Sequence, residues 1–205
     1  MTPPSDLARR ADRRAAILEA AALEFAVRGY DATRAADVAR RAGVASGTVF
    51  YHFGDKATLF REVFADDLPR ARRLAEEARR LDDPVNAALH LVDGLAADVL
   101  APGAPVLAAE LVRRVGVDPE LARVVAETDR ITRGALAETI ERGVRTGRFD
   151  PTLDPPTAAG LVLAMVDGLY LGADPEHDLR PALRRAVAAY LRSPDMTEED
   201  DDRPT

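Results

Sequence analysis

Apolar residues recur every three or four positions along most of the chain, which is the spacing of an amphipathic helix. No stretch shows the regular alternation that marks a half-buried strand. The pattern therefore predicts an all-α protein of about nine helices, near residues 12–28, 34–42, 46–53, 55–81, 83–101, 104–115, 118–147, 154–173 and 179–191. Pro69 lies inside the fourth helix, so we expect a bend or a short break near Asp67 and Leu68.

The segment from Thr33 to Lys56, TRAADVARRAGVASGTVFYHFGDK, has the pattern of two short helices joined by a turn. Thr33 is expected to cap the first helix, because its hydroxyl can accept from free backbone N–H groups. Gly43 can adopt positive φ at little cost and so reverse the chain. The segment therefore predicts a helix-turn-helix.

The second helix of this motif, opened by Ser46 and Gly47, has two different sides. Its polar side carries Thr48, Tyr51 and His52, and its other side carries Val49, Phe50 and Phe53. Hydroxyl, phenol and imidazole groups can bond to phosphate oxygens or to base edges. Alternatively, the aromatic residues merely close a small core, which is our interpretation for Phe53 and Phe50. For Tyr51 and His52 we favour contact with DNA.

Residues 14–65 resemble the DNA-binding region of the TetR family of bacterial regulators, through ILEAAALEFAVRGYDAT and DVARRAGVASGTVFYHFGDKATLF. The resemblance implies that Arg34, Ser46, Gly47, Thr48, Tyr51, His52 and Lys56 lie at or near DNA, and we add Thr33 at the start of the motif. Three positions depart from the family. Ala36 replaces a frequent Arg, Ala45 replaces a frequent capping Ser, and Ser46 stands where Lys, Arg or Pro is frequent. Fewer operator contacts are therefore expected.

The charge of the chain is divided unevenly. The net charge is −7, but residues 1–60 carry nine basic and seven acidic side chains, which leaves −9 for the remainder. Four arginines gather around the start of the first long helix, at Arg9, Arg10, Arg13 and Arg14. They either meet phosphates or form an ordinary solvated helix start. Lys56 is the only lysine, and it is placed where a compact charge can reach a backbone phosphate.

Composition also bears on the compartment. The chain has no cysteine, and its N-terminus has no apolar run typical of a signal peptide. The most apolar segment, residues 158–173, is too short to span a bilayer and contains Asp167. A cytoplasmic protein is the expectation.

The segment 154–173 is apolar nearly all round, so something outside its own domain must cover one face. A second subunit is the simplest cover, and the last helix supplies further apolar positions at Ala182, Ala186, Val187, Ala189, Tyr190 and Leu191. The resemblance implies a four-helix dimer interface made by these two helices of each subunit. A buried monomer core is the alternative. Two-fold symmetry would place the reading helices in successive major grooves, about 34 Å apart, and so predicts a palindromic operator.

The resemblance implies a ligand-responsive bundle in the C-terminal domain, and a few polar residues there are candidates for the lining of its pocket. Asn86, His90 and Asp93 can share one helix face, and Glu110, Asp129, Met165 and Tyr170 are further candidates for the lining. Alternatively, His90 is an ordinary core or surface residue, and Met165 and Tyr170 pack in the subunit interface. No Gly-x-Ser-x-Gly, P-loop, dinucleotide or His-Glu-x-x-His motif is present. The three histidines are too scattered to predict a metal site. We expect no enzyme activity and no cofactor.

These observations predict a DNA-binding domain at residues 1–54, a ligand-binding and dimerisation domain at 55–193 and an acidic, disordered tail at 194–205. The hypothesis is a homodimeric transcriptional repressor that a small molecule releases from its operator. The alternative is a helical small-molecule-binding protein whose DNA-binding head is vestigial. The weak positive charge of the head and the departures at Ala36 and Ala45 favour this alternative.

Overall fold

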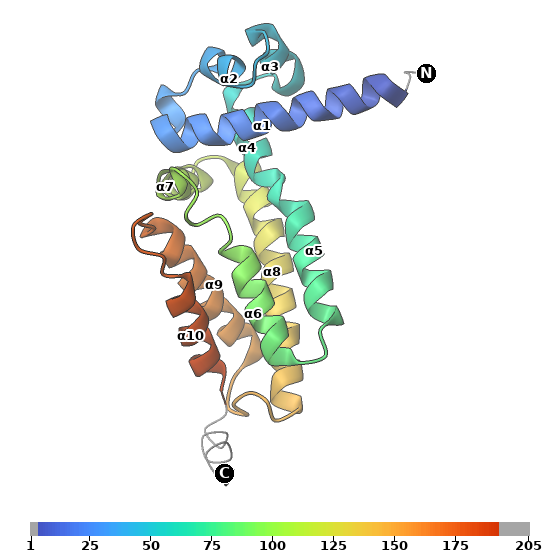
Figure 1. The fold of residues 1–205 in the computed structure, drawn as a ribbon, viewed down its shortest axis with the longest axis vertical. Coiled ribbons are helices and arrows are strands. Elements are labelled where there is room, and N and C mark those ends of the chain that lie inside the picture. Colours follow the sequence, from blue (N-terminus) through green and yellow to red (C-terminus); the bar gives the residue numbers. More distant parts are fainter. Residues whose placement is uncertain (1–3, 193–205) are drawn as a thin grey trace, which may run out of the picture. The chain divides into compact units, whose positions relative to one another are not determined.

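The computed structural model describes the backbone of residues 4–192 and the side chains from residue 8 onward, so the predicted acidic tail at 194–205 lies outside the described residues. Within this range every extended regular element is a helix (Figure 1). The ten helices are α1 (Pro4–Ala32), α2 (Ala35–Arg41), α3 (Ser46–Phe53), α4 (Lys56–Ala65), α5 (Asp67–Arg80), α6 (Pro84–Leu95), α7 (Ala104–Val115), α8 (Pro119–Arg145), α9 (Pro155–Leu171) and α10 (Arg180–Leu191). The all-α prediction is confirmed.

The tenth helix arises from the break that Pro69 predicts. The expected helix 55–81 is two helices, α4 and α5, which meet at Asp66, and Pro69 lies in the first turn of α5. Two predicted ends were wrong. α6 stops at Leu95 rather than near residue 101, and α1 begins at Pro4 rather than near residue 12. The backbone of α1 also leaves helical geometry at Gly29, where φ is 73°.

Aspartates begin four of the helices, as the sequence predicts. Asp55 accepts from the N–H of Thr58 at 2.7 Å at the start of α4. Asp83, Asp118 and Asp154 do the same for α6, α8 and α9. Each carboxylate satisfies backbone donors that have no partner within the helix, and its negative charge suits the helix N-terminus.

The described chain divides into two compact units. The first contains residues up to Leu68 together with 101–127, and the second contains 69–100 and the residues from 128 onward. α8 begins in the first unit and continues into the second. These units are defined by which residues pack together. The predicted boundary at residue 54 instead separates the residues expected to bind DNA from those expected to bind a ligand, and it stays a prediction.

The first unit has its core between α1 and the helices that pack on it. Ile17, Phe25, Phe60 and Leu121 are fully buried there. α7 lies against α1, and Gly103, the N-cap residue of α7, has a φ of 79° and lies close to the backbone of α1. A Cβ at Gly103 would stand 2.5 Å from the carbonyl oxygen of Ala26. Only glycine therefore fits at the start of α7.

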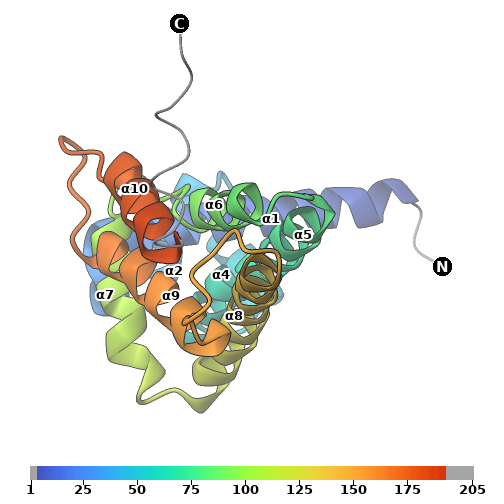
Figure 2. The same cartoon turned by 90° about the horizontal axis from the view of Figure 1, so that it is seen from below.

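The second unit is a bundle of α5, α6, α9, α10 and the greater part of α8 (Figure 2 looks roughly along α5 and α8). Its core includes Leu91, Leu136, Ile140, Val162 and Val187, each almost completely buried. No helix in the described part of the chain is long and apolar enough to cross a membrane.

Candidate nucleic-acid interface

The predicted helix-turn-helix is present. α2 ends at Arg41, Gly43 adopts a φ of 66°, and the N–H of Val44 donates to the carbonyl of Ala39 at 3.0 Å. The chain thus reverses within four residues before α3 begins at Ser46. No atom lies within 4 Å of a Cβ placed on Gly43, so the need for glycine there is one of backbone conformation alone.

α3 has a fixed inner side and an accessible outer side. Val49 and Phe53, four residues apart, are 2% and 4% exposed and anchor the helix in the core. Tyr51 is 71% exposed. Ser46 and Gly47 are exposed as well, and Thr48 and His52 are half-buried. The structure therefore brings five of the eight predicted DNA contacts onto this helix, and Arg34 lies exposed just before α2.

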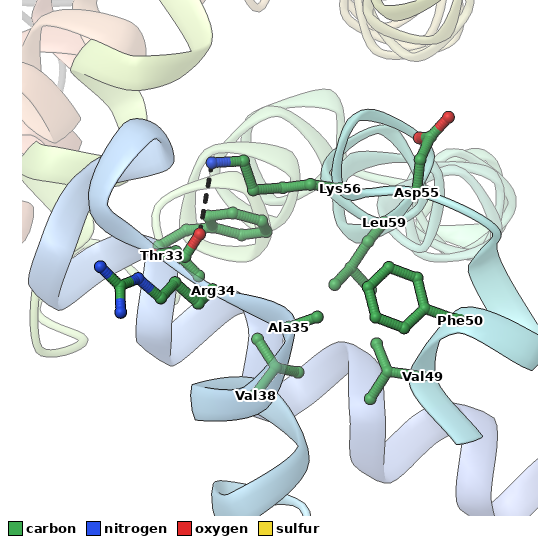
Figure 3. A pocket seen from close by; sticks show the side chains of 10 residues that line it. Thr33, Arg34, Ala35, Val38, Val49, Phe50, Asp55, Lys56 and Leu59 are labelled. Carbon is green, nitrogen blue, oxygen red and sulfur yellow. Dashed lines mark hydrogen bonds between the residues drawn. The ribbon is translucent and has the colours of Figure 1, made fainter. Parts of the chain in front are cut away.

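Phe50 corrects one prediction. It was expected to close the core, but it is 54% exposed. On a helix of eight residues, Val49 and Phe53 fix the buried stripe, and Phe50 is turned about 100° from Val49. Its ring instead borders a mostly apolar hollow of about 260 Å³ between α2, α3 and α4 (Figure 3). The hollow is lined by Phe25, Thr33, Arg34, Ala35, Val38, Val49, Phe50, Asp55, Lys56 and Leu59.

Thr33 does not cap α2, contrary to the prediction. The N-cap position of α2 is Arg34, which makes no side-chain capping bond. The Thr33 hydroxyl is buried and donates to the carbonyls of Gly29, at 2.7 Å, and Glu24, at 3.1 Å. Gly29 is the residue at which the backbone of α1 leaves helical geometry. Thr33 thus fastens the motif to α1 and presents no hydroxyl to DNA.

Lys56 makes its hydrogen bonds within the fold, and its contact with a phosphate stays a prediction. Its Nζ donates to the carbonyls of Tyr30, Asp31 and Thr33, at 2.9, 3.1 and 3.3 Å (Figure 3 shows the bond to Thr33). It also lies 4.5 Å from the centroid of the Tyr30 ring. An ammonium has three donors, and all three are used. Lys56 therefore holds the start of α4 against the end of α1, where carbonyls favour a cation.

Arginines from the start of α1 reach α3. Arg10 donates to the hydroxyl of Tyr51 at 3.1 Å. Arg14 pairs with Glu62, and its guanidinium lies 5.6 Å from the centroid of the Phe53 ring. Burial, and then the positive charges of Arg10, Arg13 and Arg14, lower the pKa of His52. The imidazole of His52 is thus held neutral near pH 7.

A buried carboxylate joins α1 to α2. Glu24 is 3% exposed and accepts from Nε of Arg41 at 2.7 Å, while Arg28 lies 2.9 Å away. Asp37 on α2 bonds to Arg40, and this bond lowers the pKa of Asp37. The sequence gives no sign of this pairing, because Arg41 is seventeen residues away from Glu24.

Comparisons with known proteins agree with this geometry. Residues 17–63 match the family described as "Bacterial regulatory proteins, tetR family", and residues 89–194 match "BetI-type transcriptional repressor, C-terminal". The chain belongs to the TetR family. This TetR-family protein is a helix-turn-helix transcriptional regulator and not an enzyme.

Some relatives span most of the chain and others only part of it. The transcriptional repressor AcnR of Corynebacterium jeikeium is 30% identical over 90% of this TetR-family chain and 94% of its own length. KstR2 of Rhodococcus jostii is 41% identical over 33% of the chain and 36% of its own length. A TetR-family regulator from Rhodococcus sp. has a TM-score of 0.68 at 28% identity, covering 88% of this chain and 99% of that one. A Saccharomonospora viridis regulator in complex with choline shares the fold, with a TM-score of 0.74 at 22% identity over 89% and 99% of the two chains.

The structure does not gather the ligand-pocket residues that the sequence suggested for this TetR-family protein. Asn86 is exposed, His90 lies 3.0 Å from Glu77, and Asp93 pairs with Arg184. This face of α6 therefore points outward and carries one ion pair and one hydrogen bond, because the opposite face supplies the bundle core. The positions of these three residues do not fit the predicted pocket lining.

The other candidates are equally dispersed. Glu110 belongs to the first unit, where it is buried against the backbone of Gly29, and so cannot line a pocket inside the second. Asp129 forms a two-bond pair with Arg133 along α8. Met165 and Tyr170 are half-buried against the core of the second unit, and the Tyr170 hydroxyl donates to the carbonyl of Leu95 at 2.9 Å.

α9 and α10 each turn one apolar side inward and leave another uncovered. Val162, Val166 and Val187 are buried, whereas Leu161 is 43% and Leu171 is 52% exposed. Small residues complete the uncovered side, namely Ala164, Gly168, Ala182, Ala186 and Ala189. This uncovered side of α9 and α10 is where the sequence predicts a second subunit.

Proposed function

We propose that this regulator is a homodimeric repressor that binds a palindromic operator through α3 and is released by a small molecule. The observation that carries the proposal is the two-sided construction of α3. Val49 and Phe53 lock the helix into the core, while Tyr51, with Thr48 and His52 beside it, remains accessible. A rigid helix with polar groups on its outer side suits reading of base edges in a major groove.

The start of α3 supports phosphate contact. Ala45 is its N-cap residue and makes no side-chain capping bond. The first N–H groups of α3 therefore have no side-chain acceptor at that cap, and a helix N-terminus favours an anion. Ser46 and Gly47 are exposed there, so a DNA phosphate can approach the backbone closely. Arg34 adds an exposed positive charge beside α2.

The dimer is supported by the uncovered apolar side of α9 and α10. Small residues allow helices of two copies to approach closely, and a two-fold axis between them would double the number of reading helices. Two heads engaged at once gain affinity through effective concentration, so the operator is expected to be a palindrome.

Release by a ligand requires that the ligand bind the DNA-free state more tightly. We assign DNA contact to residues 1–54 and effector binding to the bundle within 55–193. The chain passes between the two units within α5, after α6 and within α8, and these three passages are the covalent connections through which a change in the bundle can reach the head.

The test is selection of genomic fragments by the purified protein at low salt, where phosphate attraction is strongest. An enriched palindrome whose affinity falls steeply with salt is the expected result. Tyr51→Ala should abolish the sequence preference while folding and dimerisation persist. If no palindrome is enriched, the protein is instead a small-molecule-binding bundle with a vestigial head. The hydrogen bonds of Thr33 and Lys56 to backbone carbonyls within the fold favour this alternative.

A further inference from the structure

Two contacts between Arg10 and Tyr51 join the basic start of α1 to α3. Nη2 of Arg10 donates to the hydroxyl of Tyr51 at 3.1 Å. The same guanidinium lies 5.6 Å from the centroid of the Tyr51 ring, within the range of a cation–π contact. One contact fixes the end of the side chain and the other fixes its ring, so Arg10 restrains a residue that is otherwise 71% exposed.

The direction of the hydrogen bond decides what Tyr51 can offer to DNA. A guanidinium has donors and no acceptor, so the phenol oxygen must accept from Arg10. The single hydroxyl proton of Tyr51 is then left to be donated outward. A cation bonded to the phenol oxygen also polarises the O–H group and strengthens it as a donor.

We propose that Arg10 is a positioning residue for sequence recognition, and that it holds Tyr51 as a hydrogen-bond donor to an acceptor on a base edge. This inference rests on the proposed function, because it needs α3 to lie in a major groove. Guanine, adenine and thymine each present an acceptor there, at O6 or N7, N7 and O4, whereas cytosine presents its N4 amino donor. Tyr51 should therefore discriminate against cytosine at the position that it reads.

The neighbouring imidazole fits this arrangement. His52 stacks edge-on with Tyr51, with ring centroids 5.4 Å apart. Burial and the charges of Arg10, Arg13 and Arg14 lower the pKa of His52, so it is neutral near pH 7. On this side of the head the positive charge is carried by Arg10, Arg13 and Arg14. Tyr51 and His52 beside them are neutral groups, which suits them to discriminate between bases.

Arg13 provides the matched control. It is exposed and lies less than one turn further along α1, so Arg13→Gln removes the same charge as Arg10→Gln. The full-length protein is first used to select its operator from a random duplex library. Affinity of the wild type, Arg10→Gln, Arg10→Lys, Arg13→Gln, Tyr51→Phe and the Arg10→Gln/Tyr51→Phe double variant is then measured over a salt series. The duplexes are the operator, single-base variants of each half-site and a scrambled sequence. Thermal unfolding of each variant verifies that the head is intact.

Arg10→Gln should weaken operator binding by about tenfold more than Arg13→Gln, since it loses a bond and a ring contact as well as a charge. On scrambled DNA the two variants should be alike. Arg10→Gln and Tyr51→Phe should lose discrimination against cytosine at the same base, and in the Tyr51→Phe background the extra effect of Arg10→Gln should disappear. Arg10→Lys should keep the salt dependence but lose most of the preference.

Equal effects of Arg10→Gln and Arg13→Gln on the operator would overturn the inference and leave Arg10 as an ordinary phosphate contact. Additive losses in the double variant would do the same. Either result leaves the proposed repressor standing, whereas failure of the wild-type protein to select any sequence defeats the proposed function itself.

Discussion

Replacement of Lys56 by Met tests whether this lysine stabilises the fold or contacts DNA. The ammonium makes three bonds to carbonyls at the end of α1, at 2.9, 3.1 and 3.3 Å, and lies 4.5 Å from the centre of the Tyr30 ring. Methionine keeps the apolar stem and loses all four contacts. A bond to a charged group contributes about 1.5–3 kcal/mol when protected from water, and much less when exposed. Because one of the bonds is exposed and two are half-buried, we expect Lys56→Met to lower the free energy of unfolding by about 2–3 kcal/mol.

The assay is urea unfolding followed by circular dichroism, combined with operator affinity measured against salt. A loss of 2–3 kcal/mol is a large part of the roughly 5–15 kcal/mol that stabilises most domains, so the midpoint should move clearly. Arg34→Met is the matched control, because Arg34 is an exposed cation in the same unit. It should change stability by no more than about 0.5 kcal/mol and, if it contacts a phosphate, reduce the salt slope by about 0.9. A Lys56→Met protein with an unchanged urea midpoint and a slope reduced by about 0.9 would refute the structural role of Lys56.

Three further changes test other parts of the structure. Gly103→Ala should destabilise the protein by about 2–4 kcal/mol, since it combines positive φ with a clash against backbone, whereas Gly43→Ala should cost only about 1 kcal/mol; thermal unfolding that ranks the two equally would contradict this. The His52 ring resonances should titrate below the ordinary pKa of about 6.5, and the midpoint should rise in Arg10→Gln. The folded head binds this proton less readily than the unfolded chain does, so His52 should lower the free energy of unfolding as the pH falls below about 6.5. A His52 contribution that raises the free energy of unfolding in that range would contradict this prediction. Ala186→Glu should convert the proposed dimer to a monomer in light scattering without loss of helicity, and a dimer that persists would place the interface elsewhere.

The sequence predicted features whose causes are local. Asp55 and Asp154 cap their helices through N–H groups only three residues away, and Pro69 lies within the helix that it interrupts. Such signals can be read without knowledge of the fold. The helix-turn-helix belongs to this class too, since the conformation at Gly43 depends on its own backbone.

The features that sequence reasoning missed depend on partners far along the chain. Lys56 bonds to carbonyls 23–26 residues away, and Thr33 turns its hydroxyl back to Glu24. Phe50 was misplaced because a short helix with several aromatic residues offers more than one apolar stripe, and tertiary packing selects between them. The polar face of α6 gave no indication of whether it would point into the bundle or toward solvent, because Asp93 is paired with Arg184, 91 residues away.

The first compact unit is assembled from two stretches of chain, residues up to 68 and residues 101–127, with the second unit's α5 and α6 encoded between them. A chimera that grafts only the N-terminal stretch onto another regulator would leave behind α7 and the buried Leu121. It would also leave behind Arg114, whose guanidinium lies 3.4 Å from the centre of the Tyr30 ring. The recipient would have to supply equivalent surfaces of its own. Exchange of reading heads between such proteins, in the laboratory or by recombination, is therefore constrained by a helix that is absent from the transferred segment.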